Sequence, residues 1–167
     1  MLKLIECPRD AMQGLHDFIP TEEKANYINQ LLKVGFDTID FGSFVSPLSV
    51  PQMRDTSDVV ELLNIQPNTS LLSIVLNRRG AAEAASFDQI KILGYPLSIS
   101  EIFQKNNSNK DILSSLSVID EIQNICIRNN KTLLIYFSMA FGNPYGEDWN
   151  ESILLSYIDK IKKKDIN

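Results

Sequence analysis

The amino-acid sequence predicts an α/β fold in which a parallel sheet is covered by helices. Five apolar runs are each too short for a helix and nearly continuous in hydrophobicity, which is typical of strands buried on both faces. Helical patterns lie between these runs, and parallel neighbours in a sheet need such crossover connections. The 167 residues, 44% of them hydrophobic and 22% charged, are enough for a sizeable core. We therefore expect residues 1–167 to form one domain.

The five apolar runs are the expected strands, because each is rich in Ile, Leu or Val and is followed by polar or turn-forming residues. In chain order they are Lys3 to Cys7, Thr38 to Gly42, Leu71 to Val75, Gln89 to Leu93 and Thr132 to Phe137. Strand and helix then alternate about five times along the chain. No internal repeat of residue identity is found.

Two of the intervening helical patterns are complete. Thr21 is the expected N-cap of the first, and Gly35 is expected to end it. Asp111 opens the second, whose apolar face runs to a turn at residues 128–130. The asparagine-rich residues 106–109 are expected to form a loop before it. Weaker patterns predict helices over Met53 to Leu63, Gly80 to Phe87 and Glu151 to Lys163.

Polar side chains follow the carboxyl end of every predicted strand. Because these ends meet at one edge of a parallel sheet, we expect the side chains to line one ligand crevice. They are Arg9, Asp10 and Gln13 after the first strand, Asp40 and Ser43 at the second, Asn77, Arg78 and Arg79 after the third, Ser98, Ser100 and Glu101 after the fourth, and Ser138 and Asn143 after the fifth. An Arg-Asp pair alone would read as two solvated charges on a turn. Its place at this shared edge favours a functional site.

Asp40 stands inside the apolar stretch Thr38 to Gly42, where an unpaired carboxylate would be costly to bury. It therefore needs a cation or hydrogen-bond donors. Arg9 is one candidate and a metal ion held by Asp10 is another, while a purely structural Asp–Arg pair is the alternative.

The loop from Ser43 to Met53 is unusually apolar for a connection at this edge of the sheet. Two prolines stiffen it, and its serines, Ser43 and Ser46 among them, can donate to a ligand. The loop predicts one wall of a binding site. The alternative is a loop packed against a neighbouring helix or subunit.

Composition and missing motifs exclude several classes of function. The 16 Lys and Arg against 21 Asp and Glu give a net charge of −5, which argues against nucleic acid and favours small-molecule partners. No run approaches the length of a membrane span, and the N-terminus lacks a secretion signal, so we expect a cytoplasmic protein with reduced cysteines. Walker, G-x-G-x-x-G, C-x-x-C and G-x-S-x-G motifs are missing. His16, the only histidine, has no neighbours at metal-ligand spacing.

Six short segments along the chain match elements of a known family. They resemble R-D-x-x-Q, S-F-V-S-P, V-P-Q-M, N-x-R-G, S-E-x-x-x-x-x-N and G-x-P-Y of the 3-hydroxy-3-methylglutaryl-CoA lyases, members of a metal-dependent lyase and Claisen-synthase superfamily. R-D-x-x-Q is shared widely in the superfamily, whereas S-F-V-S-P and V-P-Q-M are specific to the lyases. The matching segments are Pro8 to Gln13, Ser43 to Pro47, Val50 to Met53, Leu76 to Gly80, Ser100-Glu101 with Lys105-Asn106, and Gly142 to Tyr145.

The resemblance implies a (β/α)8 TIM barrel, truncated here to about five β/α units, because a complete barrel typically takes about 250 residues. It also implies retro-Claisen cleavage of the acyl-CoA substrate 3-hydroxy-3-methylglutaryl-CoA to acetyl-CoA and acetoacetate, assisted by Mg²⁺ or Mn²⁺, and a place in leucine degradation. An acyl-CoA condensing member of the superfamily is the nearest alternative.

The resemblance further implies roles for individual residues. Asp10 would bind the metal, which would lower the pKa of the substrate's 3-hydroxyl, and Arg9 would face the enolate oxygen of the departing acetyl thioester. Asp40 stands where the family usually has a catalytic Glu. The substrate-binding residues implied are Gln13, Ser43, Ser46, Asn77, Asn106 and Ser138.

Three of the family's β/α units have no counterpart in these 167 residues. In the family, those units carry an H-x-H pair of metal ligands, a later metal-binding Asn and a cysteine loop. Strand five also lacks an arginine that often precedes the family's G-Y-x-S segment. We therefore expect the 167-residue chain to be inactive when expressed alone. Its open sheet would be covered in a homo-oligomer or by a completing partner chain; a non-catalytic partial barrel that pairs with another chain is the alternative of a different class.

Overall fold

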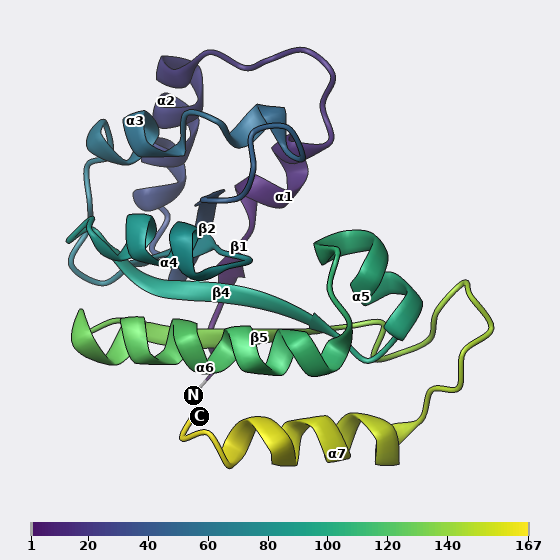
Figure 1. Cartoon of the computed structure of the whole chain (residues 1–167). Coiled ribbons are helices and arrows are strands. Elements are labelled where there is room, and N and C mark those ends of the chain that lie inside the picture. Colours follow the sequence, from purple (N-terminus) through teal and green to yellow (C-terminus); the bar gives the residue numbers. More distant parts are fainter. Residues whose placement is uncertain (1, 167) are drawn as a thin grey trace.

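A computed structural model of the protein describes residues 2–166, and a five-stranded parallel sheet forms its centre (Figure 1). The sheet order β1-β2-β3-β4-β5 follows the chain, and all four pairings are parallel. The five strands form a half-barrel, which confirms the predicted α/β class. They are β1 (Ile5–Glu6), β2 (Thr38–Ser43), β3 (Ser70–Ile74), β4 (Ile90–Ser98) and β5 (Thr132–Ser138).

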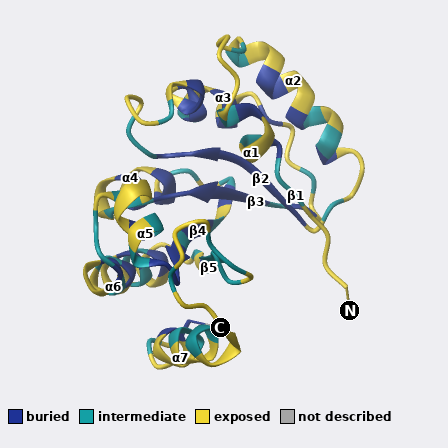
Figure 2. Ribbon diagram, turned by 90° about the vertical axis from the view of Figure 1, so that its right-hand side faces the viewer, coloured by how far each residue is buried: buried dark blue, intermediate teal, exposed yellow. Residues whose placement is uncertain are grey.

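Helices connect the strands and cover the outer side of the sheet, so that buried residues on the helices face the strands (Figure 2). Ile28 of α2 and Ile119 of α6 have no exposed surface and pack in the same core as Leu71 and Leu93 of the sheet. The elements are α1 (Pro8–Gln13), α2 (Thr21–Leu32), the 3-10 turn η1 (Pro51–Met53), α3 (Thr56–Glu61), α4 (Arg78–Ala85), α5 (Glu101–Ser108), α6 (Ile112–Arg128) and α7 (Glu151–Lys162).

β4 is longer than the sequence predicts, because it continues through Pro96 to Ser98. The Gly94 carbonyl accepts a hydrogen bond from the Val75 amide at 2.9 Å, so Gly94 points toward β3. Pro96, two residues on, faces the same side, where β3 has already ended at Ile74. The missing amide proton of Pro96 therefore costs no sheet hydrogen bond.

Two helices and one cap differ from the predictions. α1 and α5 were not expected, because helices of six and eight residues are too short to display a full apolar stripe. Residues 106–108 are the last turn of α5 rather than a loop, and the chain leaves the helix at Asn109 (φ 54°). Pro20, not Thr21, occupies the N-cap of α2, since the Thr21 hydroxyl donates to Asp55 Oδ2 at 2.8 Å instead. Asp111 caps α6 as predicted.

None of the helices in residues 2–166 has both the length and the apolar character needed to cross a membrane.

Candidate active site

The end of β1 and the start of α1 position Arg9, Asp10 and Gln13. Pro8 is the first helical residue, which suits its fixed φ, and Arg9 and Gln13 then lie one turn apart on the same face of α1. Arg9 Nη1 donates to Asp10 Oδ1 at 2.9 Å and to Gln13 Oε1 at 3.0 Å. Gln13 Nε2 donates back to Asp10 Oδ1 at 3.0 Å. The three side chains thus form a closed polar network.

Asp40 on β2, the strand next to β1, completes this network. Its carboxylate has no exposed surface, and it accepts from Arg9 Nε at 3.2 Å and from Arg9 Nη2 at 2.5 Å. Burial raises the pKa of the Asp40 carboxyl, while the two hydrogen bonds from Arg9 oppose that shift. Desolvation alone would lower the pKa of Arg9, but Asp40 outweighs it and raises the pKa above its ordinary value. Arg9 is therefore a cation that pairs with Asp40.

A cavity of about 380 Å³ lies at the carboxyl ends of the strands, against this network. The predicted residues Arg9, Asp10, Gln13, Asp40, Ser43 and Ser138 all line it. Six of the side chains that the prediction gathered at one edge of the sheet therefore meet around one space. The remaining lining residues are Cys7, Val45, Val50, Ile74, Leu76, Pro96, Phe103, Asn107 and Tyr136.

Three predicted substrate-binding residues lie in a neighbouring hollow of about 420 Å³ that shares a wall with the cavity. Asn77 Oδ1 caps α4 by accepting from the Gly80 amide at 2.9 Å. Ser46 Oγ accepts from the Leu48 amide at 3.3 Å within its own turn. Asn106 lines only this hollow, whereas Asn107 lines both the hollow and the cavity. Counting S-E-x-x-x-x-x-N from Ser100 also ends at Asn107, so the amide that the motif points to is Asn107.

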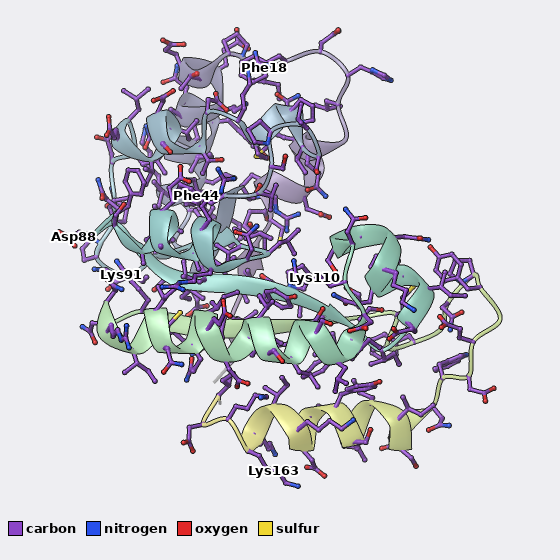
Figure 3. The ribbon with its side chains drawn as sticks, viewed as in Figure 1. Phe18, Phe44, Asp88, Lys91, Lys110 and Lys163 are labelled. Carbon is purple, nitrogen blue, oxygen red and sulfur yellow. The ribbon has the colours of Figure 1, made fainter. Side chains whose placement is uncertain are left out.

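Other predicted polar residues build the frame of the site. Glu147 accepts hydrogen bonds from the Ser100 hydroxyl and from the Glu101 amide, the latter at 3.1 Å. Asn143 Oδ1 in turn accepts from the Glu147 amide at 3.1 Å. These contacts fix the start of α5, the helix that carries Asn107 to the cavity. Figure 3 shows Lys110, just beyond α5, between that helix and the sheet.

Tyr136 is a lining residue that sequence reasoning missed. It stands two residues before Ser138 on β5, and alternating side chains along a strand place residues i and i+2 on one face. This spacing, together with the tyrosine of the family's G-Y-x-S segment, is the signal that could have found it. His16 lies elsewhere, in a separate hollow lined also by Phe18 and Arg54.

The carboxylates of the site do not make a metal centre by themselves. Across residues 2–166, no group of three His, Cys, Asp or Glu side chains is arranged to hold a metal ion. Both oxygens of Asp40 are taken by Arg9, and Asp10, with 65% of its side chain exposed, keeps Oδ2 free. A hard divalent ion takes about six oxygen ligands. The described residues therefore offer such an ion one carboxylate, not a complete site.

Gly80 allows the loop after β2 to lie against α4. A Cβ atom at Gly80 would come 2.1 Å from the Phe44 carbonyl oxygen. Phe44 is buried, with its ring 5.7 Å from that of Phe87, and Figure 3 shows it among the side chains near α4. The close approach of the Phe44 backbone thus explains the glycine of the N-x-R-G segment. By allowing this approach, Gly80 also positions Ser43 and Val45, which line the cavity.

We expect Gly80→Ala to lower the free energy of unfolding by about 1–3 kcal/mol, because the backbone must move to admit the methyl group. Gly14→Ala is the matched control, since nothing lies within 4 Å of a Cβ there and its φ of −88° suits alanine. Denaturant unfolding followed by circular dichroism measures both. Equal stability of the two variants would contradict the close-approach explanation.

Comparison with known proteins was made by sequence and by structure. No family model matches the chain. The hydroxymethylglutaryl-CoA lyase of Bacillus subtilis is 33% identical over 141 residues, which cover 84% of this chain and 47% of the relative. The mitochondrial hydroxymethylglutaryl-CoA lyase of Gallus gallus is 35% identical over 147 residues, covering 86% of this chain and 48% of the relative. The chain spans about half the length of the curated relatives it matches.

Solved structures give the same relationship. An HMG-CoA lyase from Acinetobacter baumannii, in complex with coenzyme A and 3-methylmalate, superposes with a TM-score of 0.92 at 27% identity, covering 99% of this chain and 54% of that one. The Bacillus subtilis HMG-CoA lyase superposes with a TM-score of 0.91 at 31% identity, covering 98% of this chain and 56% of that one.

Proposed function

Because this chain belongs by sequence and fold to the hydroxymethylglutaryl-CoA lyases, of which it spans about half, we propose that it forms the enolate-facing part of a lyase active site. The reaction is cleavage of 3-hydroxy-3-methylglutaryl-CoA to acetyl-CoA and acetoacetate. The observation that carries the proposal is the Arg9–Asp40 pair, held with Asp10 and Gln13 against a cavity at the carboxyl ends of five parallel strands.

The chemistry requires stabilisation of negative charge. When the carbon–carbon bond breaks, its electron pair passes onto the acetyl thioester, whose oxygen becomes an enolate. Arg9 is a permanent cation at the cavity wall, and Asp40 keeps it charged and correctly aimed. Ser43, Ser138 and Gln13 line the same space and can bind substrate oxygens. The solved relative that holds coenzyme A and 3-methylmalate supports an acyl-CoA substrate.

Asp10 is the residue of this chain that would hold Mg²⁺ or Mn²⁺, which when bound would act as a Lewis acid on the substrate. Since Asp10 alone among residues 2–166 offers a free carboxylate oxygen at the cavity, the remaining ligands would come from further β/α units, supplied by another polypeptide segment. Assignment to leucine degradation rests on the family alone. We propose a cytoplasmic location: the rat relative whose alignment covers 98% of this chain is described as cytoplasmic, whereas the Gallus gallus relative is described as mitochondrial.

The test is a chimera in which the full chain is followed by the part of the Bacillus subtilis lyase that has no counterpart in it. We expect metal-dependent release of acetyl-CoA and acetoacetate from 3-hydroxy-3-methylglutaryl-CoA. A folded, metal-binding chimera that leaves 3-hydroxy-3-methylglutaryl-CoA uncleaved would contradict the proposal. Condensation of an acyl-CoA with an oxo acid, measured in parallel, would instead favour a condensing member of the superfamily.

Asp10→Asn should weaken Mn²⁺ binding by the chimera about tenfold or more, because it removes a charged oxygen ligand. Asp17→Asn is the control, since Asp17 is an exposed carboxylate outside the cavity. Titration of Mn²⁺ followed by electron paramagnetic resonance gives both affinities. If the two variants bind Mn²⁺ equally well, Asp10 is not a metal ligand.

A further inference from the structure

The hydrogen bonds of Arg9 leave it with few donors for a substrate. A guanidinium carries five N–H groups. Nε–H and one Nη2–H are directed to Asp40, and the two bonds from Nη1 go to Asp10 and Gln13. One N–H on Nη2 remains. Charge that develops on an oxygen is normally held by more than one preorganised donor, so the cavity needs a second one.

Two hydroxyls at the cavity meet this need. Ser43 Oγ and Tyr136 Oη belong to lining residues, both atoms are buried, and neither has a hydrogen-bond partner among the described residues. An unpaired buried hydroxyl costs free energy, which a ligand oxygen would recover. A phenol is ordinarily more acidic than an aliphatic alcohol, and burial opposes the ionisation of both, so the phenol stays the stronger hydrogen-bond donor of the two. Tyr136 is therefore the better partner for an enolate.

The surroundings of Tyr136 suit a donor that keeps its proton. Burial, and then the charges of Asp40 and Cys7, raise the pKa of the phenol far above its ordinary value, with Arg9 opposing the shift. The ring also lies close to β4. A Cβ atom at Gly94 would lie 3.0 Å from Tyr136 Cε2, so the glycine makes room for the ring on the inner face of the sheet.

We propose that Tyr136 is a further catalytic residue, whose hydroxyl donates, together with the free Nη2–H of Arg9, to the thioester oxygen of the acyl-CoA as it becomes an enolate. The inference rests on the proposed function. The substrate's carbon–carbon bond breaks and its electron pair passes to the acetyl thioester, which becomes an enolate, while the 3-hydroxyl loses its proton and acetoacetate forms. A proton passes through water to the terminal carbon of the enolate, which gives acetyl-CoA. Tyr136 transfers no proton; it stabilises the charge by hydrogen bonding alone.

Tyr136→Phe in the chimera tests the assignment. We expect kcat to fall about 10²-fold, while KM stays within about threefold, because the lost bond is made mainly in the transition state. Tyr95→Phe is the matched control, since Tyr95 is a fully buried tyrosine on the neighbouring strand that does not line the cavity. A kcat for Tyr136→Phe near that of the parent, or an equal loss in Tyr95→Phe, would overturn the proposal. Ser43→Ala shows whether that hydroxyl is the second donor instead.

A measurement without turnover separates this inference from the proposed function. If the folded chimera cleaves nothing, the proposed function fails, and Tyr136 is then judged by calorimetric titration with coenzyme A and 3-methylmalate. At least about fivefold weaker binding of 3-methylmalate by Tyr136→Phe, and not by Tyr95→Phe, would still support a ligand-contacting hydroxyl. Equal affinities, or no binding by the parent chimera, would overturn it.

Discussion

Arg9→Gln in the completed barrel should lower kcat by about 10²–10³-fold and the free energy of unfolding by about 3–5 kcal/mol. The loss of turnover follows from removing the cation that faces the enolate. The loss of stability follows from Asp40, which has no exposed surface and would lose both of its Arg9 hydrogen bonds. Removing one partner of a buried ion pair is strongly destabilising, because it leaves an uncompensated buried charge.

The double variant Arg9→Gln/Asp40→Asn separates these two effects. With the negative charge gone, most of the stability should return, while turnover stays low because the enolate still lacks its cation. Asp40→Asn alone should lower kcat by a larger factor than it lowers the equilibrium constant for folding, since Arg9 keeps Asp10 and Gln13 as partners. Urea unfolding and steady-state kinetics on the parent, the two single variants and the double variant complete the cycle.

A second buried ion pair provides the control. Lys24 and Asp55 lie 2.6 Å apart, 2% and 8% exposed, and neither lines the cavity. Lys24→Gln should destabilise the protein about as much as Arg9→Gln, yet leave kcat of the folded protein within about threefold. If the two substitutions affect kcat equally, the Arg9–Asp40 pair is structural.

Much of this site could be predicted from the sequence, because the end of each strand is marked by the change from an apolar run to polar residues. The polar residues after the first and second apolar runs, and Ser138 after the fifth, do meet at one cavity, since parallel strands share their carboxyl edge. The choice of Arg9 as the partner of Asp40 could not be made, because register and side-chain reach decide it. Tyr136 stands within an apolar run, where alternation with Ser138 marks its face and the tyrosine of the family's G-Y-x-S segment is a second signal.

The short helices and the amide positions were the least predictable features. α1 and α5 are too short for a periodic pattern, and α5 is fixed by Glu147, about 46 residues further along the chain. Asn77 and Ser46 have backbone partners of their own, a helix cap and a turn, which a residue list does not reveal. The sequence therefore predicts where in the fold the site lies better than it predicts which contacts each residue makes.

The 167-residue chain alone should show no lyase activity even with excess Mg²⁺ or Mn²⁺, and it should self-associate. Among the described residues only Asp10 offers a carboxylate to a metal at the cavity. In the same part of the chain, β5 pairs on one side only, with β4, and its residues 134–137 are partly exposed and apolar. An unpaired apolar strand edge is a template for association with another chain.

Light scattering and size-exclusion chromatography measure the association, and the chimera is the matched control. We expect the isolated chain to elute as oligomers or aggregates and the chimera as a defined species. A homo-oligomer of stable stoichiometry would identify a second copy as the cover of the open sheet. A monodisperse monomer would contradict the prediction that the edge of β5 needs a partner.

The most direct test of the account is complementation with two separate polypeptides. The full chain is mixed at increasing ratios with the part of the Bacillus subtilis lyase that it lacks, and acetoacetate formation from 3-hydroxy-3-methylglutaryl-CoA is followed with Mn²⁺ present. Neither polypeptide alone should form acetoacetate, the mixture should do so at a rate that saturates at equal amounts, and the Arg9→Gln chain should remove that activity. Metal-dependent acetoacetate formation by the isolated chain, or a mixture that assembles and stays inactive, would contradict the claim that this chain is the enolate-facing half of a lyase barrel.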